Sequence, residues 1–240
     1  MDKKNLHVAL NLGILIQELM HLISINKGRK IMYRFLLYVV RCLTFLINSN
    51  ARYIGKENLA ADENYVLVGP HRTWFEPLYF AMGGWPKRFS FMAKKELFEN
   101  PILGFILKKC HVFPVDRENP GPSAIKTPVK ALKNTDLSVM VFPSGSRYSD
   151  DLKGGAAVIA KMAKVKIVPA VYQGPLSFKA LFTKKRVTIA YGEPIDISDI
   201  KKLNKEGIAE VERRMQESFD KLDKEINPEF VYHKPVKSED

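Results

Sequence analysis

Short apolar runs that alternate with longer helical segments constrain the fold of this chain more than any other feature. Three runs are apolar and short enough to be buried strands, namely Tyr65–Val68, Leu137–Phe142 and Lys166–Tyr172. Between them lie segments with the apolar periodicity of helices, such as Ser123–Lys133. A charged amphipathic helix is predicted over residues 205–225. Strands that alternate with helices predict an α/β sandwich, in which helices cover a central sheet.

The first of these strands runs into a Gly-Pro turn and then into a polar cluster that contains His71 and Glu76. A helix is expected to follow over Leu78–Met82, so His71 should lie at the mouth of the sheet. A neutral imidazole there can accept a proton from a hydroxyl near pH 7. A carboxylate five residues further on can return across the turn to the other ring nitrogen. The two side chains are therefore a candidate general base and the group that orients it.

A purely structural interpretation of the same residues is a helix capping box. Thr73 would be the N-cap, and the Glu76 side chain would return to the backbone amide of Thr73. Pro77 opposes this register, because Pro favours the first helical position and would move the N-cap to Glu76. The motif alone leaves the catalytic and the structural interpretation open.

The strand Leu137–Phe142 leads into a second polar loop. This loop carries Ser144, Gly145, Ser146 and Arg147. Backbone amides, hydroxyl groups and a guanidinium fork in such a loop can bind a phosphate, although an ordinary turn has the same composition. Lys153 then precedes a helix that ends near Ala163, and the amides at the start of this helix would also favour an anion. A third strand, His111–Arg117, ends in a further guanidinium.

The charge of the chain predicts an anionic partner. Lys and Arg number 38 against 26 Asp and Glu, a formal net charge of +12. A nucleic-acid-binding module is not favoured, because the sequence has no helix-turn-helix signature, zinc-ligand spacing or aromatic-interleaved basic strand. Cys42 and Cys110 lie far apart without a metal-ligand spacing, so we expect neither a metal site nor a disulfide.

Two amphipathic helices are predicted before residue 50, over residues 6–25 and Ile31–Ile47. Around the second helix polar side chains recur every seven residues, at Lys27, Arg34, Arg41 and Asn48. No uncharged run approaches the roughly 20 residues of a membrane-spanning helix, and no signal-peptide cleavage site follows the first helix. The basic stripes predict helices that lie in an anionic membrane surface, with packing on the core as the alternative. Met32 could also be the true start of the protein.

With both polar loops in place, the chain resembles the 1-acylglycerol-3-phosphate acyltransferases and other glycerolipid acyltransferases that share a His-x4-Asp motif. The resemblance spans most of residues 50–192. Four segments carry it in the family's order: Gly69–Glu76, Gly104–Arg117, Phe142–Arg147 and Ile167–Ala170. It implies a mixed, largely parallel central sheet flanked by helices and preceded by a pair of membrane-associated helices.

The resemblance also implies a reaction. A fatty acyl group moves from a thioester to the 2-hydroxyl of lysophosphatidic acid, which gives phosphatidic acid in phospholipid biosynthesis. His71 would be the general base and Glu76 its orienting carboxylate. The phosphate would be bound by Arg117, Ser144, Gly145, Ser146, Arg147 and Lys153. The donor would be an acyl carrier protein or coenzyme A thioester, with no tightly bound cofactor, no metal and no nucleic acid. The expected location is the cytoplasmic face of the cell membrane, as a peripheral or monotopic enzyme.

We expect residues 1–48 to be a membrane-associating segment, residues 49–228 an acyltransferase domain and residues 229–240 a C-terminal tail. Two positions depart from the family pattern. Glu76 stands where the family has Asp, and Ser144 stands where the usual Phe-Pro-Glu-Gly-Thr-Arg has Glu. These departures leave two alternatives open. One is a different glycerolipid acceptor, such as glycerol 3-phosphate or a lysophospholipid, and the other is a catalytically silent membrane-binding relative.

Overall fold

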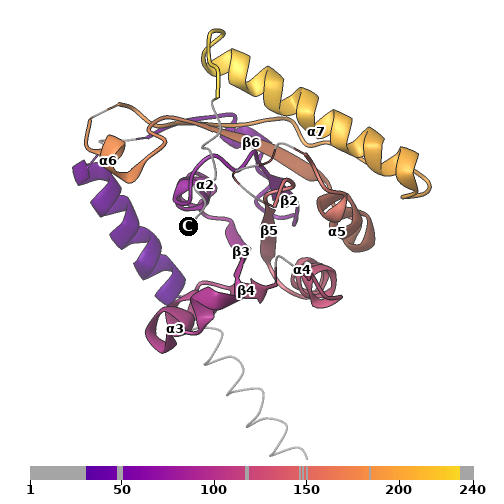
Figure 1. The fold of residues 1–240 in the computed structure, drawn as a ribbon, viewed down its shortest axis with the longest axis horizontal. Helices are drawn as coiled ribbons and strands as arrows, with labels where there is room; N and C mark the ends of the chain where they lie inside the picture. Colours follow the sequence, from indigo (N-terminus) through magenta and orange to yellow (C-terminus); the bar gives the residue numbers. More distant parts are fainter. Residues whose placement is uncertain are drawn as a thin grey trace, which may run out of the picture.

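The centre of the molecule is a seven-stranded sheet with the strand order β1-β7-β6-β2-β5-β3-β4 (Figure 1). The computed structural model describes residues 31–47, 51–116, 119–145, 147, 149, 151–183 and 185–232. Neighbouring strands run parallel except β6 and β7, which are antiparallel. The expected mixed, largely parallel sheet is therefore confirmed. The strands are β1 (Arg52–Ile54), β2 (Val66–Val68), β3 (Arg88–Lys94), β4 (Val112–Val115), β5 (Leu137–Val141), β6 (Ile167–Gln173) and β7 (Thr188–Tyr191).

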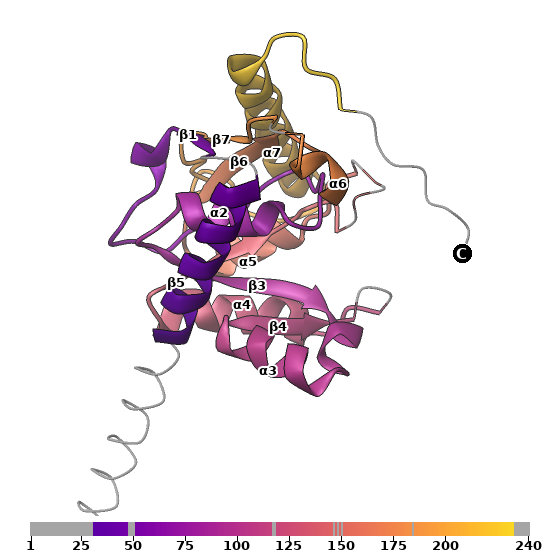
Figure 2. The same cartoon turned by 90° about the vertical axis from the view of Figure 1, so that its left-hand side faces the viewer.

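Helices cover both faces of the sheet, as Figures 1 and 2 show. One face packs against α4 (Ser123–Asn134), α5 (Gly155–Ala163) and α7 (Lys205–Ile226). The other face packs against α2 (Glu76–Gly83), α6 (Phe178–Leu181) and the helix formed by residues 31–47. Beside the edge strand β4 lies α3 (Pro101–Lys109), and two short 3-10 helices, η1 (Lys56–Asn58) and η2 (Lys95–Phe98), complete the connections.

The central strand β2 shows why the sequence gives this layered arrangement. Val66 and Val68 belong to the apolar core under α4, α5 and α7, whereas Leu67 belongs to the core under α2. Side chains of a strand alternate between the two faces, so a strand covered on both sides must be apolar at every position. All three side chains are fully buried. The uninterrupted apolar run in the sequence is thus the signature of a strand between two helical layers.

The boundaries of most elements agree with the sequence predictions. Residues 31–47 form the second of the two expected amphipathic helices, and the first, over residues 6–25, lies outside the described residues. The strand predicted to reach Arg117 ends at Val115, and Arg117 itself lies outside the described part of the chain. None of the helices in the described residues is long and apolar enough to cross a membrane.

The sheet topology brings the two polar loops of the sequence to one edge. β2 and β5 are parallel neighbours, and Val68 is paired with Val141. The loop that carries His71 and the loop that carries Ser144 therefore leave the sheet side by side. In open α/β sheets, ligands bind at the carboxyl ends of the parallel strands. This edge is consequently the place where a site is expected.

Candidate active site

His71 and Glu76 lie in direct hydrogen-bond contact. The distance between His71 Nδ1 and Glu76 Oε1 is 2.6 Å. The Glu76 side chain is fully buried, and 10% of the His71 side chain is exposed. The imidazole also stacks on Phe142 at the end of β5, with ring centroids 4.2 Å apart. The additional methylene of Glu76 therefore does not keep its carboxylate from the imidazole, and the ring is held on two sides.

The turn between His71 and α2 uses only half of the expected capping box. The Glu76 backbone amide donates to Thr73 Oγ1 at 3.0 Å, as a capping hydroxyl would allow. The Glu76 carboxylate, however, accepts from the backbone amide of Arg72, at 3.0 and 3.1 Å for its two oxygens. Phe75 is the N-cap residue of α2, so neither predicted N-cap is correct. The carboxylate is instead directed towards His71.

Burial sets the electrostatics of this pair. Desolvation raises the pKa of Glu76 above its ordinary value of 4.5, and the hydrogen bonds from His71 and from the Arg72 amide oppose this rise. An ionised carboxylate only accepts hydrogen bonds, so it fixes a proton on His71 Nδ1 and leaves a lone pair on Nε2. Among the described residues, none bonds to that Nε2. The nitrogen is therefore placed to take a proton from a bound hydroxyl group.

The loop after β5 lies beside this pair. Ser144 is almost fully buried and lines the same cavity of about 580 Å³ as His71. Gly145 adopts φ +68°, a left-handed conformation that favours glycine, and its amide donates to the Phe142 carbonyl at 2.9 Å. Lys153 donates its backbone amide to Pro143 at 3.0 Å, and its Nζ lies 3.8 Å from where a Cβ on Gly145 would be. The structure thus gathers Ser144, Gly145 and Lys153 at one loop.

The sequence predicted three further phosphate-binding residues, Arg117, Ser146 and Arg147. Arg147 belongs to the same loop, is partly exposed and takes part in an interaction with another residue. Ser146 and Arg117 lie outside the described residues. Asp116, which precedes Arg117 in the sequence, forms an ion pair with Lys95 Nζ at 2.5 Å. The two segments that the resemblance singled out, the Ser144 loop and the turn of His71 and Glu76, therefore do lie together in space.

Comparison with known proteins decides the family. A sequence model described as "Acyltransferase" matches residues 50–173, which include His71, Glu76 and the Ser144 loop. The chain belongs to the acyltransferase family. This acyltransferase is 52% identical over 200 residues to the 1-acyl-sn-glycerol-3-phosphate acyltransferase of Streptococcus pneumoniae, covering 83% of this chain and 76% of the relative. It is 42% identical over 199 residues to the protein of that name from Bacillus subtilis, covering 82% and 99%.

A solved structure supports the fold of the acyltransferase independently. The crystal structure of the 1-acyl-sn-glycerophosphate acyltransferase from Thermotoga maritima matches with a TM-score of 0.63 at 18% sequence identity. The match covers 86% of this chain and 84% of the other. At that identity the likeness concerns the fold alone.

The wall of the cavity beside His71 contains residues that the sequence did not single out. The loops after β2 and β5 form one side, and α7 with the segment that follows it forms the other. From α7 come Gln216, Phe219, Asp220, Asp223 and Lys224, and from the following segment come Pro228, Phe230, Val231 and Tyr232. In the sequence these residues belong to a charged amphipathic helix and a tail, and only the aromatic pair at 230 and 232 distinguishes the tail from solvent-exposed chain.

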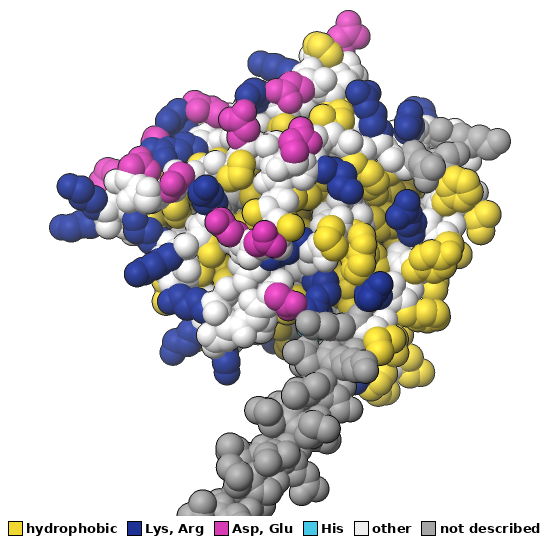
Figure 3. All heavy atoms as spheres, turned by 180° about the vertical axis from the view of Figure 1, so that it is seen from behind, with side chains coloured by type: hydrophobic (Ala, Val, Ile, Leu, Met, Phe, Trp, Pro, Cys, Tyr) yellow, Lys and Arg dark blue, Asp and Glu magenta, His cyan; other side chains and the backbone are white. Residues whose placement is uncertain are grey.

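On one side of the acyltransferase many large apolar side chains are exposed, and Figure 3 shows them gathered over helix 31–47, α3 and α6. Leu46 is 79% exposed and Ile102 is 74% exposed. We call this surface the apolar face. Its members are Ile31, Phe35, Tyr38, Leu43, Phe45 and Leu46 of helix 31–47, Ile102, Leu103, Phe105 and Ile106 of α3, and Leu176, Phe178 and Phe182 at α6.

The apolar face contacts the turn of His71 and Glu76 through Trp74. This side chain is 57% exposed and stacks on Phe178 of α6, with ring centroids 6.0 Å apart. Trp74 lies between His71 and Glu76 in the sequence. The turn that carries the candidate base therefore contacts the apolar face directly, through the Trp74 ring.

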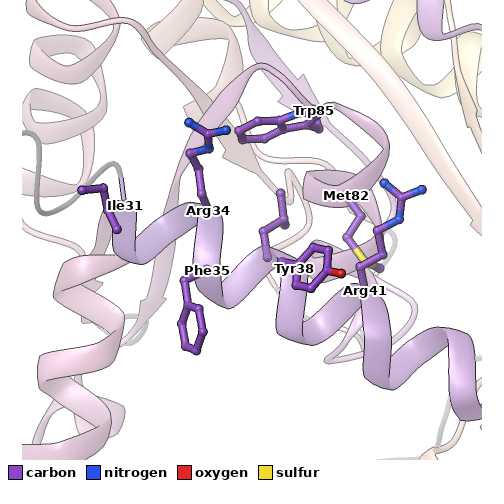
Figure 4. A pocket seen from close by; sticks show the side chains of 8 residues that line it. Ile31, Arg34, Phe35, Tyr38, Arg41, Met82 and Trp85 are labelled. Atoms are coloured by element: carbon purple, nitrogen blue, oxygen red, sulfur yellow. The ribbon is translucent and has the colours of Figure 1, made fainter.

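A groove of about 530 Å³ runs between helix 31–47 and the turn that follows α2 (Figure 4). Its lining is mostly apolar and includes Met82 and Trp85, together with the guanidinium groups of Arg34 and Arg41. Arg34 lies over the Trp85 ring, 5.4 Å from its centroid, and Phe35, the next residue of the helix, also lines the groove. The helix thus combines cationic and apolar side chains on adjoining surfaces.

Proposed function

We propose that this protein is a 1-acyl-sn-glycerol-3-phosphate acyltransferase, which moves a fatty acyl group from a thioester to the 2-hydroxyl of lysophosphatidic acid. The observation that carries the proposal is the 2.6 Å contact between His71 Nδ1 and the buried Glu76 carboxylate. Two relatives with 52% and 42% identity bear this enzyme's name. The product is phosphatidic acid.

His71 is the general base of the reaction. Its Nε2 accepts the proton of the 2-hydroxyl while the hydroxyl oxygen bonds to the carbonyl carbon of the thioester. Glu76 holds the Nδ1–H tautomer and stabilises the imidazolium that forms. The tetrahedral intermediate then breaks its C–S bond, and the departing thiolate receives the proton from His71 Nε2. A positioned base supplies about 10²–10⁴ in rate, so alignment of the two substrates must supply much of the remainder.

The loop after β5 binds the phosphate of the acceptor. Ser144 lines the cavity next to His71, and Lys153 Nζ approaches Gly145 in the same loop. Together with Ser146, Arg147 and Arg117 these groups provide hydroxyl, amide and cationic donors, which are the partners that phosphate requires. A phosphate held there would place the glycerol 2-hydroxyl within reach of the imidazole.

The acyl donor is a thioester, and the chemistry is the same for acyl carrier protein and coenzyme A. Both release a thiolate, and neither requires a bound cofactor. In the described residues, no group of three or more His, Cys, Asp or Glu side chains is arranged to hold a metal ion. In either case His71 Nε2 protonates the departing thiolate.

Residues 1–48 associate the enzyme with the cytoplasmic face of the cell membrane, where its lipid substrate is found. Exposed apolar side chains of helix 31–47 support this assignment, as do Arg34 and Arg41 at the groove in Figure 4. Apolar side chains enter the acyl boundary of a membrane while basic side chains meet anionic head groups. Trp74 would bring the catalytic turn of residues 49–228 to that boundary, and residues 229–240 follow as a C-terminal tail.

Acyl transfer with purified protein tests the proposal. Labelled acyl-carrier-protein and acyl-CoA thioesters are each offered with lysophosphatidic acid, glycerol 3-phosphate or lysophosphatidylcholine. We expect thiol release that depends on lysophosphatidic acid and yields phosphatidic acid. Transfer to one of the other acceptors alone would change the substrate. No transfer to any acceptor, by protein that binds vesicles, would favour the catalytically silent relative instead.

A further inference from the structure

Arg72, the residue that follows the catalytic histidine, is a buried cation held by several partners. It is 6% exposed. Its Nη1 donates to the Tyr172 carbonyl at 2.7 Å and to Asp223 Oδ1 at 2.8 Å, and its Nη2 is paired with Asp223 Oδ2. Asp223 in turn accepts from Gln173 Nε2 at 2.9 Å. The guanidinium is therefore fixed to β6 and to α7.

The segment after α7 covers the same guanidinium with two aromatic rings. The guanidinium carbon lies 4.9 Å from the centroid of Phe230 and 5.4 Å from that of Tyr232. The Tyr232 hydroxyl donates to the Arg72 carbonyl at 3.3 Å. The Phe230 amide donates to the Asn227 carbonyl at 3.0 Å, which closes a turn at the end of α7. Cation–π contacts of this kind are strongest where water is excluded.

The backbone of Arg72 bonds directly to Glu76, while its side chain is held by β6, by α7 and by the segment after α7. Its amide donates to both oxygens of the Glu76 carboxylate, at 3.0 and 3.1 Å. Its carbonyl carries the bond from Tyr232. The Arg72 side chain is fixed to β6 and α7, and the Arg72 carbonyl is fixed by Tyr232. The Arg72 amide therefore has little freedom to move. The amide in turn determines where the Glu76 carboxylate meets His71.

A buried ion pair does not by itself explain why this position is charged. Replacing such a pair with apolar residues of similar volume is often neutral or stabilising, because both charges must be removed from water. The rigid guanidinium fork offers a fixed geometry that an apolar side chain lacks. The guanidinium belongs to the residue next to the base in the sequence. This location indicates that the ion pair serves to align the Arg72 amide with Glu76.

We infer that Arg72 is a positioning residue for the acyl transfer. Through Asp223, Phe230 and Tyr232 it ties the amide that orients Glu76 to α7 and to the segment that follows that helix. Residues 227–232 thereby contribute to the geometry of the His71–Glu76 pair without touching the reacting atoms. The kinetic test of this inference rests on the proposed function. A second test, by the proton resonance of His71, does not depend on that function.

The decisive variant is the apolar replacement Arg72→Met/Asp223→Leu. If the pair has only a structural role, this variant keeps its kcat at temperatures where it is folded, whether or not its melting temperature changes. If the pair positions the amide, kcat falls about tenfold or more while KM for lysophosphatidic acid stays near the wild-type value. The matched control is Arg214→Met/Asp199→Leu, which removes another Arg–Asp pair between α7 and the preceding loop. The control is expected to keep its kcat.

A second variant covers the case in which the first does not fold. Phe230→Ala/Tyr232→Ala removes the two rings and leaves the ion pair, and we expect a smaller loss of kcat with KM unchanged. Unchanged kcat in this variant, together with an unchanged His71 resonance, would overturn the inference.

The readout that needs no substrate is the proton resonance of His71 Nδ1–H. A proton shared with a carboxylate at 2.6 Å appears far downfield, and His71→Gln identifies it among the five histidines. We expect this resonance to weaken or move upfield in both Arg72-linked variants and to stay in place in the control. An unmoved resonance in correctly folded variants contradicts the inference. A wild-type protein with the resonance but without acyl transfer would instead contradict the proposed function.

Discussion

The centre around His71 and the apolar face both reverse the usual exposure of side chains: the first buries a charged group, and the second exposes apolar ones. In the centre, the carboxylate of Glu76 is fully buried. On the apolar face, Leu46 and Ile102 are 79% and 74% exposed. Soluble proteins usually bury leucine and isoleucine and expose glutamate. Neither arrangement stabilises the folded chain by itself, so each is best explained by what it contacts during function.

The contrast also teaches how one turn can connect the two environments. His71 and Glu76 face the cavity at the sheet edge, whereas Trp74, between them in the sequence, stacks on Phe178 at the apolar face. An acceptor with a polar head and an acyl chain presents the same division. The two regions should therefore respond to different substitutions, and the following predictions test that separation.

The largest expected effect comes from His71→Ala. Loss of the base should lower kcat/KM by about 10²–10⁴, measured by thiol release with lysophosphatidic acid. Binding to anionic vesicles should not change, because the variant leaves the apolar face intact. A variant with wild-type turnover would remove His71 from the mechanism, and a variant that lost vesicle binding would show that the two regions are not separate.

Arg147→Ala should weaken binding of the acceptor's phosphate and leave membrane binding unchanged. A charge-assisted hydrogen bond to phosphate contributes about 1.5–3 kcal/mol, which corresponds to a rise of about 10- to 100-fold in KM for lysophosphatidic acid. Arg147→Lys is the matched variant and should show a smaller rise, because lysine keeps the charge without the fork. A rise confined to the KM of the thioester would assign Arg147 to the donor instead.

The apolar face is tested by Phe35→Ser/Leu46→Ser. Burial of each original side chain contributes about 1.5–3 kcal/mol, so loss of both should lower the vesicle partition coefficient by about 100-fold or more. Transfer to lysophosphatidic acid in detergent micelles should remain close to wild type. Met162→Ser on α5, which is also exposed but lies under the other face of the sheet, is the control. Equal losses in the control and the test variant would disprove a localised membrane surface.

The smallest expected effect concerns stability. Burial raises the pKa of Glu76, so the folded protein holds a proton that the unfolded chain has already released above pH 4.5. The free energy of unfolding of the wild type therefore falls as pH rises from 4.5 through the raised pKa. Glu76→Gln lacks this proton. Its stability relative to wild type should increase across that window, by about 1 kcal/mol as is usual for one substitution, in urea titrations. A difference that stays constant with pH would contradict the raised pKa.

The sequence was sufficient for the local parts of the site. His71 and Glu76 are five residues apart, so a single turn can join them, and the parallel pairing of β2 with β5 brings the Ser144 loop alongside. The N-cap of α2 was predicted wrongly because the Glu76 side chain bonds to Arg72 and His71 rather than to the Thr73 amide.

The distant parts of the site were not predictable in the same way. Arg72 and Asp223 are separated by 151 positions, and Tyr232 by 160, so their contacts depend on where α7 packs on the sheet. Amphipathic periodicity predicts that such a helix has a buried face. It does not predict which strand that face covers. The exposure of α3 was likewise not readable, since its apolar side chains resemble those of a helix packed on the core.

Single-turnover acyl transfer to lysophosphatidic acid by wild type, Glu76→Asp and Glu76→Gln tests the central claim most directly. If His71 is the base and its carboxylate partner orients it, Glu76→Gln should slow the chemical step by about 10²-fold or more, while Glu76→Asp, which keeps the charge, retains most of the rate. A Glu76→Gln variant within about twofold of the wild-type rate would contradict the account, because the buried carboxylate would then have no part in catalysis.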